Sequence, residues 1–239
     1  MCKYLYYPVF VLVDRSFHYA PELQACGVCC IISDTVPVPG ELICTQVLAV
    51  VPEMEYMTAD ATITKIITHC HNVLDELFLV HQEAALQGMF DDAIELFNSY
   101  RELHDLHKSF EDEKLIPKFH EFEDQGRWPA SLYTLEHDKI RDLMEKTEQY
   151  LTGLADSRLE GRNLRRNIIA FLEREKTFKG YCEHHQDREE EGLLPELDKL
   201  TDSTWRAGII SPFVEEWKNC LIRNKESISK LEKISGSKR

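Results

Sequence analysis

The chain has 239 residues and a formal net charge of −14, from 28 basic and 42 acidic side chains. Hydrophobic residues make up 43% of it and charged residues 29%, which is typical of a globular protein and excludes collagen-like, mucin-like and fully disordered chains. Binding to phosphates needs clustered Lys and Arg, so this acidic balance predicts neither nucleic acid nor an anionic membrane as the main partner and favours a cation.

The N-terminal region shows no pattern of an exported or membrane protein. No stretch reaches about 18 uncharged apolar residues, the length that a membrane-spanning helix needs. Residues 1–13 contain an apolar run, but Pro8 interrupts it, and Asp14 and Arg15 follow without a small-residue cleavage site. The eight cysteines are scattered unevenly, which is not a disulfide framework. We therefore expect a cytoplasmic protein.

The composition changes near residue 56. Residues 1–56 carry 8 charged residues and five of the nine prolines, whereas 57–239 carry 62 charged residues at helical spacing. This change predicts three parts. They are a non-helical or β-prone N-terminal extension (1–56), a helical bundle (57–200), and a C-terminal helix packing on or extending from that bundle (201–239).

The spacing of apolar residues after residue 60 predicts four long amphipathic helices and a fifth one. Ser131 is expected to cap the third helix, and Ser157 with Glu160 forms a capping-box signature for the fourth. The fifth is expected to open at Ser211, with Pro212 in its first turn. Short links between long helices predict an all-α fold, an antiparallel four-helix bundle with an additional C-terminal helix. The four expected bundle helices cover residues 60–86, 89–120, 131–152 and 157–198.

One thirteen-residue pattern occurs twice without a gap. H-x3-E-x3-L-[IL]-P-x-[FL] matches residues 107–119 and again residues 185–197. The preceding helix carries a further His in each case, His71 and His137, and apolar residues follow three and six places after both. The unit from 71 to 119 therefore recurs as 137 to 197.

This spacing predicts a metal site. A His and a Glu four residues apart lie on one helix face, so both can reach the same point or two adjacent metal ions. Four imidazoles and two carboxylates suit a pair of iron or manganese ions with the carboxylates as bridges, and the lack of thiolates argues against a structural zinc site. The predicted ligands are His71, His107, Glu111, His137, His185 and Glu189.

Two of these ligands have neighbouring alternatives. His69 lies two residues before His71, and His184 directly precedes His185. Alignment of the two copies favours His71 and His185. The surplus acids beside the predicted ligands are expected to be solvated, and they are Glu113, Glu190 and Glu191.

The sequence also suggests places for other side chains near the pattern. His104 lies one turn before the predicted ligand His107. Its role is that of a hydrogen-bonding partner of a ligand, an extra ligand, or a hydrogen-bonded His outside the site. Tyr100 and Phe178 occupy equivalent places in the two copies and are expected to pack near the site. His81 and His120 are expected at the surface.

The repeated pattern resembles the hemerythrin-like HHE cation-binding family over about residues 70–200. The resemblance implies a four-helix bundle holding a non-haem, carboxylate-bridged centre of two iron ions, with the six residues above as ligands and manganese or zinc less expected. Oxygen-carrying members have a His and an Asp where this chain has Arg141 and Glu190, or Glu189 when the position is counted from His184. That departure places the chain nearer to the branch with four His and two Glu, which includes iron–sulfur cluster repair proteins and iron- or oxygen-sensing domains.

The resemblance implies redox or small-molecule chemistry with oxygen, nitric oxide or peroxide, or iron donation. The expected ligand is then a small diatomic molecule or peroxide, and a redox or regulatory protein is the expected partner. The alternative is an iron- or oxygen-responsive sensor or binding module without turnover, in which metal occupancy stabilises the bundle. The sequence leaves open whether the protein is an enzyme.

Overall fold

The computed structural model describes residues 62–122 and 126–229, so the predictions for residues 1–56 and for the last residues of the C-terminal helix lie outside it. Every regular element within these ranges is helical, which confirms the all-α class for this part of the chain. None of the described helices is long and apolar enough to cross a membrane.

A tight turn joins the first two helices, α2 (Ile63–Leu86) and α3 (Phe90–Phe110). The hydroxyl of Thr62 accepts a hydrogen bond from the backbone N–H of Lys65 and caps the start of α2. Gly88 follows the end of α2 with a φ of 77°, in the left-handed region that favours glycine. The chain therefore reverses within a few residues, and α3 packs along α2.

The next two long helices are α5 (Ala130–Ala155) and α6 (Gly161–Arg188). The predicted caps of both helices were wrong. Extended backbone at Pro129 starts α5, and no side chain caps it. The hydroxyl of Ser157 donates to the carbonyl of Leu154 and so belongs to the end of α5, which leaves α6 without a side-chain cap.

Each of α3 and α6 runs into a five-residue π-helical turn and then into a short α-helix. In both turns a backbone N–H bonds to a carbonyl five residues back. The second residue of each following helix is the proline of the repeated pattern, which lacks an N–H and would crowd the carbonyl four residues back in a regular helix. The wider turn accommodates it, and such turns are frequent at functional sites. These elements are η1 (Glu111–Leu115), α4 (Ile116–His120), η3 (Glu189–Leu193) and α7 (Leu194–Leu200).

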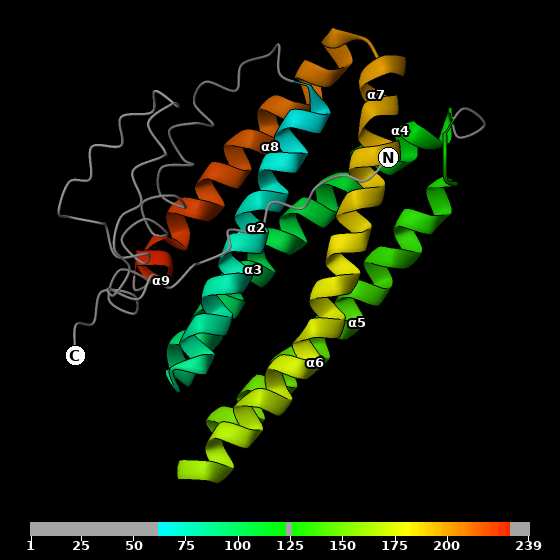
Figure 1. The fold of residues 1–239 in the computed structure, drawn as a ribbon. Helices are drawn as coiled ribbons and strands as arrows, with labels where there is room; N and C mark the ends of the chain where they lie inside the picture. The colour runs from blue at the N-terminus through cyan, green and yellow to red at the C-terminus, as the bar shows by residue number, and fades with distance from the viewer. Residues whose placement is uncertain (1–61, 123–125, 230–239) are drawn as a thin grey trace, which may run out of the picture. The chain divides into compact units, whose positions relative to one another are not determined.

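The four long helices pack around one interior (Figure 1). α2 contacts both α3 and α6, while α5 contacts both α3 and α6. Their inward faces bury large apolar side chains such as Leu77, Phe97 and Ile140. Burial of a side chain of this size contributes about 1.5–3 kcal/mol, so this interior is the main source of stability for the described helices.

The C-terminal helix is longer than its sequence pattern predicts. α8 spans Ser203–Arg223, and the carboxylate of Asp202 caps it by accepting from the backbone N–H of Trp205. The predicted start at Ser211 was wrong, because Pro212 lies inside the helix. A short helix, α9 (Lys225–Ser229), follows α8.

α8 packs on the half of the bundle formed by α2 and α3 (Figure 1). Phe213 and Trp217 are buried on its inner face. The ring of Phe213 stacks on Phe110 of α3, with their centroids 4.1 Å apart. Within the described residues, the α2–α3 half therefore has an apolar outer covering, and α5 and α6 have no comparable contact with α8.

Candidate metal centre

The six side chains predicted as ligands come together in the interior of the bundle. All are buried, with at most 4% of any of them exposed. Their ligand atoms form two groups of four, and the atoms of each group lie within 4.8 Å of one another. Both groups contain Glu111 and Glu189. One group is completed by His71 and His107, and the other by His137 and His185.

The carboxylates stand between the two halves of the bundle. Glu111 lies 3.3 Å from Nε2 of His107, one turn back on its own helix, and 3.2 Å from Nε2 of His137 on α5. Glu189 lies 3.1 Å from Nε2 of His185 and 3.2 Å from Nε2 of His71 on α2. Each carboxylate therefore faces one imidazole of its own half and one of the other half.

The inner atoms of this cluster lie 3.1–3.3 Å from one another, but within the described residues none of them makes a hydrogen bond of regular geometry. They include both oxygens of Glu111 and Glu189, and Nε2 of His71, His137 and His185. Buried carboxylates without partners are costly, usually by several kcal/mol, unless they are paired or bind a metal. Imidazole nitrogens and carboxylate oxygens are the ligands that iron, manganese and zinc accept in proteins. The cluster therefore fits a metal ion.

Acidic side chains hold two of the imidazoles from behind. Nδ1 of His71 donates to Glu190 at 2.9 Å, and Nδ1 of His137 donates to Asp112 at 2.7 Å. With Nδ1 protonated, Nε2 carries the lone pair that faces the cluster, as in most metal-binding His. Glu190, expected to be solvated, is partly exposed but also holds the imidazole of His71. Asp112 and Glu190 directly follow the inward Glu in both copies of the pattern, and that shared acid could have revealed them.

A different acid holds a third imidazole. Nδ1 of His185 donates to Glu136 at 3.1 Å, and Glu136 also pairs with Arg188. Nothing in the sequence pattern marks Glu136, because the equivalent residue of the first copy is Cys70. Nδ1 of His107 has no hydrogen-bond partner among the described residues.

The charges in the cluster shift the acid–base properties of its members. Burial alone would lower the pKa of His71, but the carboxylates of Glu189 and Glu190 raise it to about 9. Burial alone would also lower the pKa of His137, but the carboxylates of Asp112 and Glu111 raise it to about 8. Burial and the charge of Glu189 raise the pKa of Glu111 to about 7. At neutral pH a metal ion therefore competes with protons for these ligands.

A small cavity lies beside the imidazoles of the cluster. Its volume is about 10 Å³, close to the smallest space that holds one water-sized molecule. His104, Tyr100 and Cys182 also line it. Nδ1 of His104 is buried without a partner, and burial with the charges of His137 and His185 lowers its pKa to about 3. A neutral imidazole outside both ligand groups therefore borders this space.

The alternative ligands lie outside the cluster. Neither His69 nor His184 belongs to either group of converging ligand atoms, and His184 is exposed. The expectation that His81 lies at the surface was wrong. It is fully buried, where Nδ1 donates to the carbonyl of Ala93 and Nε2 lies 2.6 Å from Glu175 on α6. His120 is exposed.

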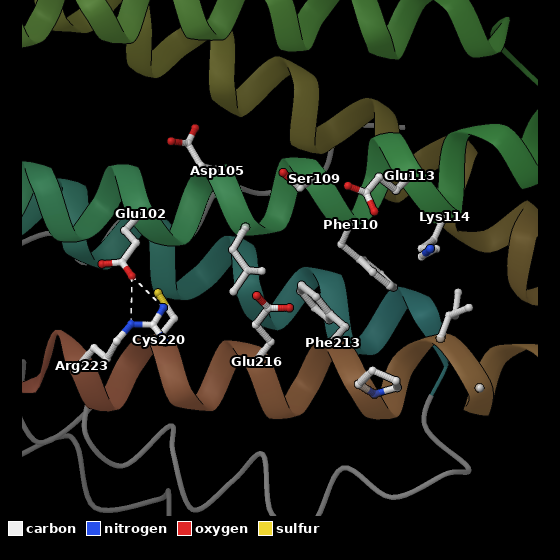
Figure 2. Close-up of a pocket in the computed structure, with 14 residues that line it drawn as sticks. Glu102, Asp105, Ser109, Phe110, Glu113, Lys114, Phe213, Glu216, Cys220 and Arg223 are labelled. Atoms are coloured by element: carbon white, nitrogen blue, oxygen red, sulfur yellow. Dashed lines mark hydrogen bonds and ion pairs between the residues drawn. The ribbon is translucent and has the colours of Figure 1, made fainter.

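A larger pocket of about 800 Å³ lies between α3 and α8 (Figure 2). Phe110 and Phe213 meet within it, and Arg223 pairs with Glu102 at one end. Helical residues advance about 100° each, so the α3 residues that line the pocket lie on the opposite face from His107 and Glu111. None of the six cluster residues lines this pocket.

Comparisons with known proteins leave the site to be interpreted from its own geometry. No protein-family model, curated protein or solved structure matches the chain. Fold and site together define a helical protein with a buried His and Glu cluster that could hold a metal ion. This arrangement is compatible with a hemerythrin-like fold.

Proposed function

We propose that this chain is a hemerythrin-like protein that binds two iron ions in a carboxylate-bridged, non-haem centre. One observation carries the proposal, namely that two groups of four ligands share Glu111 and Glu189. Carboxylates that belong to both groups are placed to bridge two metal ions. In this proposal α2, α3, α5 and α6 form an antiparallel four-helix bundle, an architecture that holds such centres between facing helices.

The ligand chemistry favours iron. The donor set contains imidazoles and carboxylates without thiolates, which suits iron or manganese better than a structural zinc ion. Manganese is the second choice, because it accepts the same donors. The three thiols of the described residues, Cys70, Cys182 and Cys220, are absent from both ligand groups.

The proposed use of the centre is redox or small-molecule chemistry with oxygen, nitric oxide or peroxide, or iron donation. Bound iron ions would supply electrons and coordination positions for such a molecule. The helices exclude bulk water from the cluster, and the cavity of about 10 Å³ limits what can enter to very small molecules. His104 presents an unpaired nitrogen to that molecule. A redox or regulatory protein is the proposed partner, and the cytoplasm the proposed location.

Elemental analysis and an absorption spectrum test this function. Protein purified from iron-supplemented cells should hold two iron ions per chain, one for each ligand group. A His107→Ala/His185→Ala variant should lose the iron and its absorption bands. His184→Ala is the matched control, because His184 is exposed beside a ligand and should leave both unchanged. A colourless protein without stoichiometric metal would contradict the proposal.

A sensor without turnover is the second candidate function. The ligands come from α2, α5 and the junctions of α3 and α6 with their π turns, so metal occupancy is coupled to the packing of all four helices. A ligand at about 1,000 times its Kd stabilises a fold by about 4 kcal/mol. Unfolding with and without iron separates the two candidates. Loss of the fold without iron favours a sensor, whereas a stable fold with rapid consumption of reductant and oxidant favours an enzyme.

A further inference from the structure

The two ligand groups differ in the side chains that hold their imidazoles. In the group of His137 and His185, Asp112 and Glu136 accept a hydrogen bond from each Nδ1. In the other group only His71 has such an acceptor, and His107 has none among the described residues. Acceptors of this kind fix the ring orientation and raise the basicity of a ligating nitrogen.

The acceptors also differ in exposure. The side chain of Glu136 is 3% exposed, whereas that of Glu190, which holds His71, is 38% exposed. Water and salt screen an exposed carboxylate more than a buried one. Glu190, the single acceptor of the first group, is therefore screened more strongly than Glu136.

The packing of α8 explains why the halves differ. Glu136 and its partner Arg188 correspond in the repeat to Cys70 and Phe110. Phe110 stacks on Phe213 of α8, so the α2–α3 half uses an apolar side chain where the other half has an ion pair. A buried carboxylate needs a partner, and the apolar covering of α8 provides none at this place.

We propose that the two metal positions differ in affinity, and that the position of His137 and His185 fills first. The position of His71 and His107 then holds the exchangeable metal ion. This inference rests on the proposed binding of metal. Loss of an outer acceptor costs about 10- to 100-fold in metal affinity, so the two positions should differ by at least about tenfold.

Variants that keep one position each measure this difference directly. His71→Ala/His107→Ala leaves only the position of His137 and His185. His137→Ala/His185→Ala leaves only the position of His71 and His107. Each purified chain is titrated with Co²⁺ alone, whose absorption in the visible reports binding, and helix content is checked by circular dichroism. The chain that keeps His137 and His185 should bind Co²⁺ at least about tenfold more tightly. Equal or reversed affinities would overturn the inference.

Substitutions of Glu136 test the cause. In the chain that keeps His137 and His185, Glu136→Leu should remove most of the advantage. Glu136→Gln should retain it, because the amide oxygen still accepts from His185. A Glu136→Leu chain with undiminished affinity would overturn the role of this acceptor.

The chain that keeps all six cluster residues is also titrated with Co²⁺. This titration separates failure of the proposed function from failure of the inference, and it remains informative if the double variants do not fold. If the unaltered chain binds no Co²⁺, the proposed function fails. If it binds, Glu136→Leu should weaken the first binding event and Glu190→Ala the second. The opposite assignment, or an equal effect of both substitutions on both events, would overturn the inference while the proposed function stands.

Discussion

The two halves of the bundle carry the same types of cluster residue in different surroundings. The half of α2 and α3 and the half of α5 and α6 each provide two His, one Glu, a π turn that begins at that Glu, and an acid directly after it. These features lie on the faces that meet at the centre. The residue types on the inner face of each half therefore follow from the cluster, whereas those on the outer face follow from the element that packs on it.

The residues that border the centre differ between the halves. Tyr100 and His104 of α3 correspond to Phe178 and Cys182 of α6. The hydroxyl of Tyr100 lies 3.8 Å from Sγ of Cys182, and both line the small cavity. Burial raises the pKa of Cys182 to about 12, so the group there is a thiol. The side chains that line the cavity therefore differ between α3 and α6, although the six cluster residues are nearly symmetric.

The largest expected effect comes from removing what the halves share. Glu111 belongs to both ligand groups, so Glu111→Ala should abolish binding of both metal ions. Glu191→Ala is the control, because that carboxylate is exposed and pairs with Arg127, away from the cluster. Elemental analysis of the two variants checks this. A Glu111→Ala chain that keeps its full metal content would contradict the shared role.

The convergence of the six side chains is the part of the site that the sequence predicts well, because the pattern that carries them occurs twice. A single H-x3-E pair is common on exposed helices, whereas two copies at matched distances from His71 and His137 require a shared cause. Asp112 and Glu190 could be predicted in the same way. Glu136 and the pair of His81 with Glu175 could not, because each occurs in one copy only.

Helix starts were predicted poorly for a physical reason. Ser157 and Pro212 have residue types that favour the first turn of a helix, but the same types also fit elsewhere. Ser157 bonds backward to α5, and Asp202 provides an earlier cap for α8 than Ser211 does. Local signals name several candidate starts, and packing against the bundle chooses among them.

The pair of His81 and Glu175 offers the next largest effect, on stability. His81 of one half bonds to Glu175 of the other, and the equivalent positions are Thr147 and Phe97, so the pair has no counterpart. Glu175→Ala leaves a buried imidazole without its partner and should lower the free energy of unfolding by about 3–5 kcal/mol. Denaturant unfolding measures this. Glu173→Ala on the same helix, which is exposed, should change it by less than about 0.5 kcal/mol.

Metal binding should depend on pH because protons and metal ions compete for the same nitrogens. With a pKa of about 9 for His71 and about 8 for His137, both imidazoles are protonated at pH 7. Binding should then release at least about two protons, because Glu111, with a pKa of about 7, is partly protonated as well. The overall affinity should fall by about 1.4 kcal/mol per released proton for each pH unit below 8. Calorimetry in buffers of different ionisation enthalpy measures the release. Affinity that does not change between pH 6 and 8 would contradict these shifts.

A smaller effect is expected where one copy has glycine and the other has lysine. Gly192 of η3 corresponds to Lys114 of η1. An added Cβ at Gly192 would lie 2.8 Å from the ring of Trp128 and 2.9 Å from the hydroxyl of Tyr133. Gly192→Ala should therefore destabilise the fold by about 1–3 kcal/mol. Lys114→Ala is the matched control, because Lys114 is exposed and its loss should change the free energy of unfolding by less than about 0.5 kcal/mol. Equal melting temperatures of the two variants would contradict this packing.

The smallest effect should come from making the halves alike beside the cavity. Tyr100→Phe gives α3 the residue that α6 has at Phe178, and it removes only a hydroxyl whose contact with the sulfur of Cys182 is long. The free energy of unfolding should change by less than about 1 kcal/mol, and metal content should not change. Any larger change should appear in the binding of nitric oxide to the iron-loaded chain, because the hydroxyl borders the space that such a molecule would enter. Loss of metal in Tyr100→Phe would instead mean that the phenol supports the ligands themselves, and the two halves would then differ in their ligand support at α3 as well as in their outer faces.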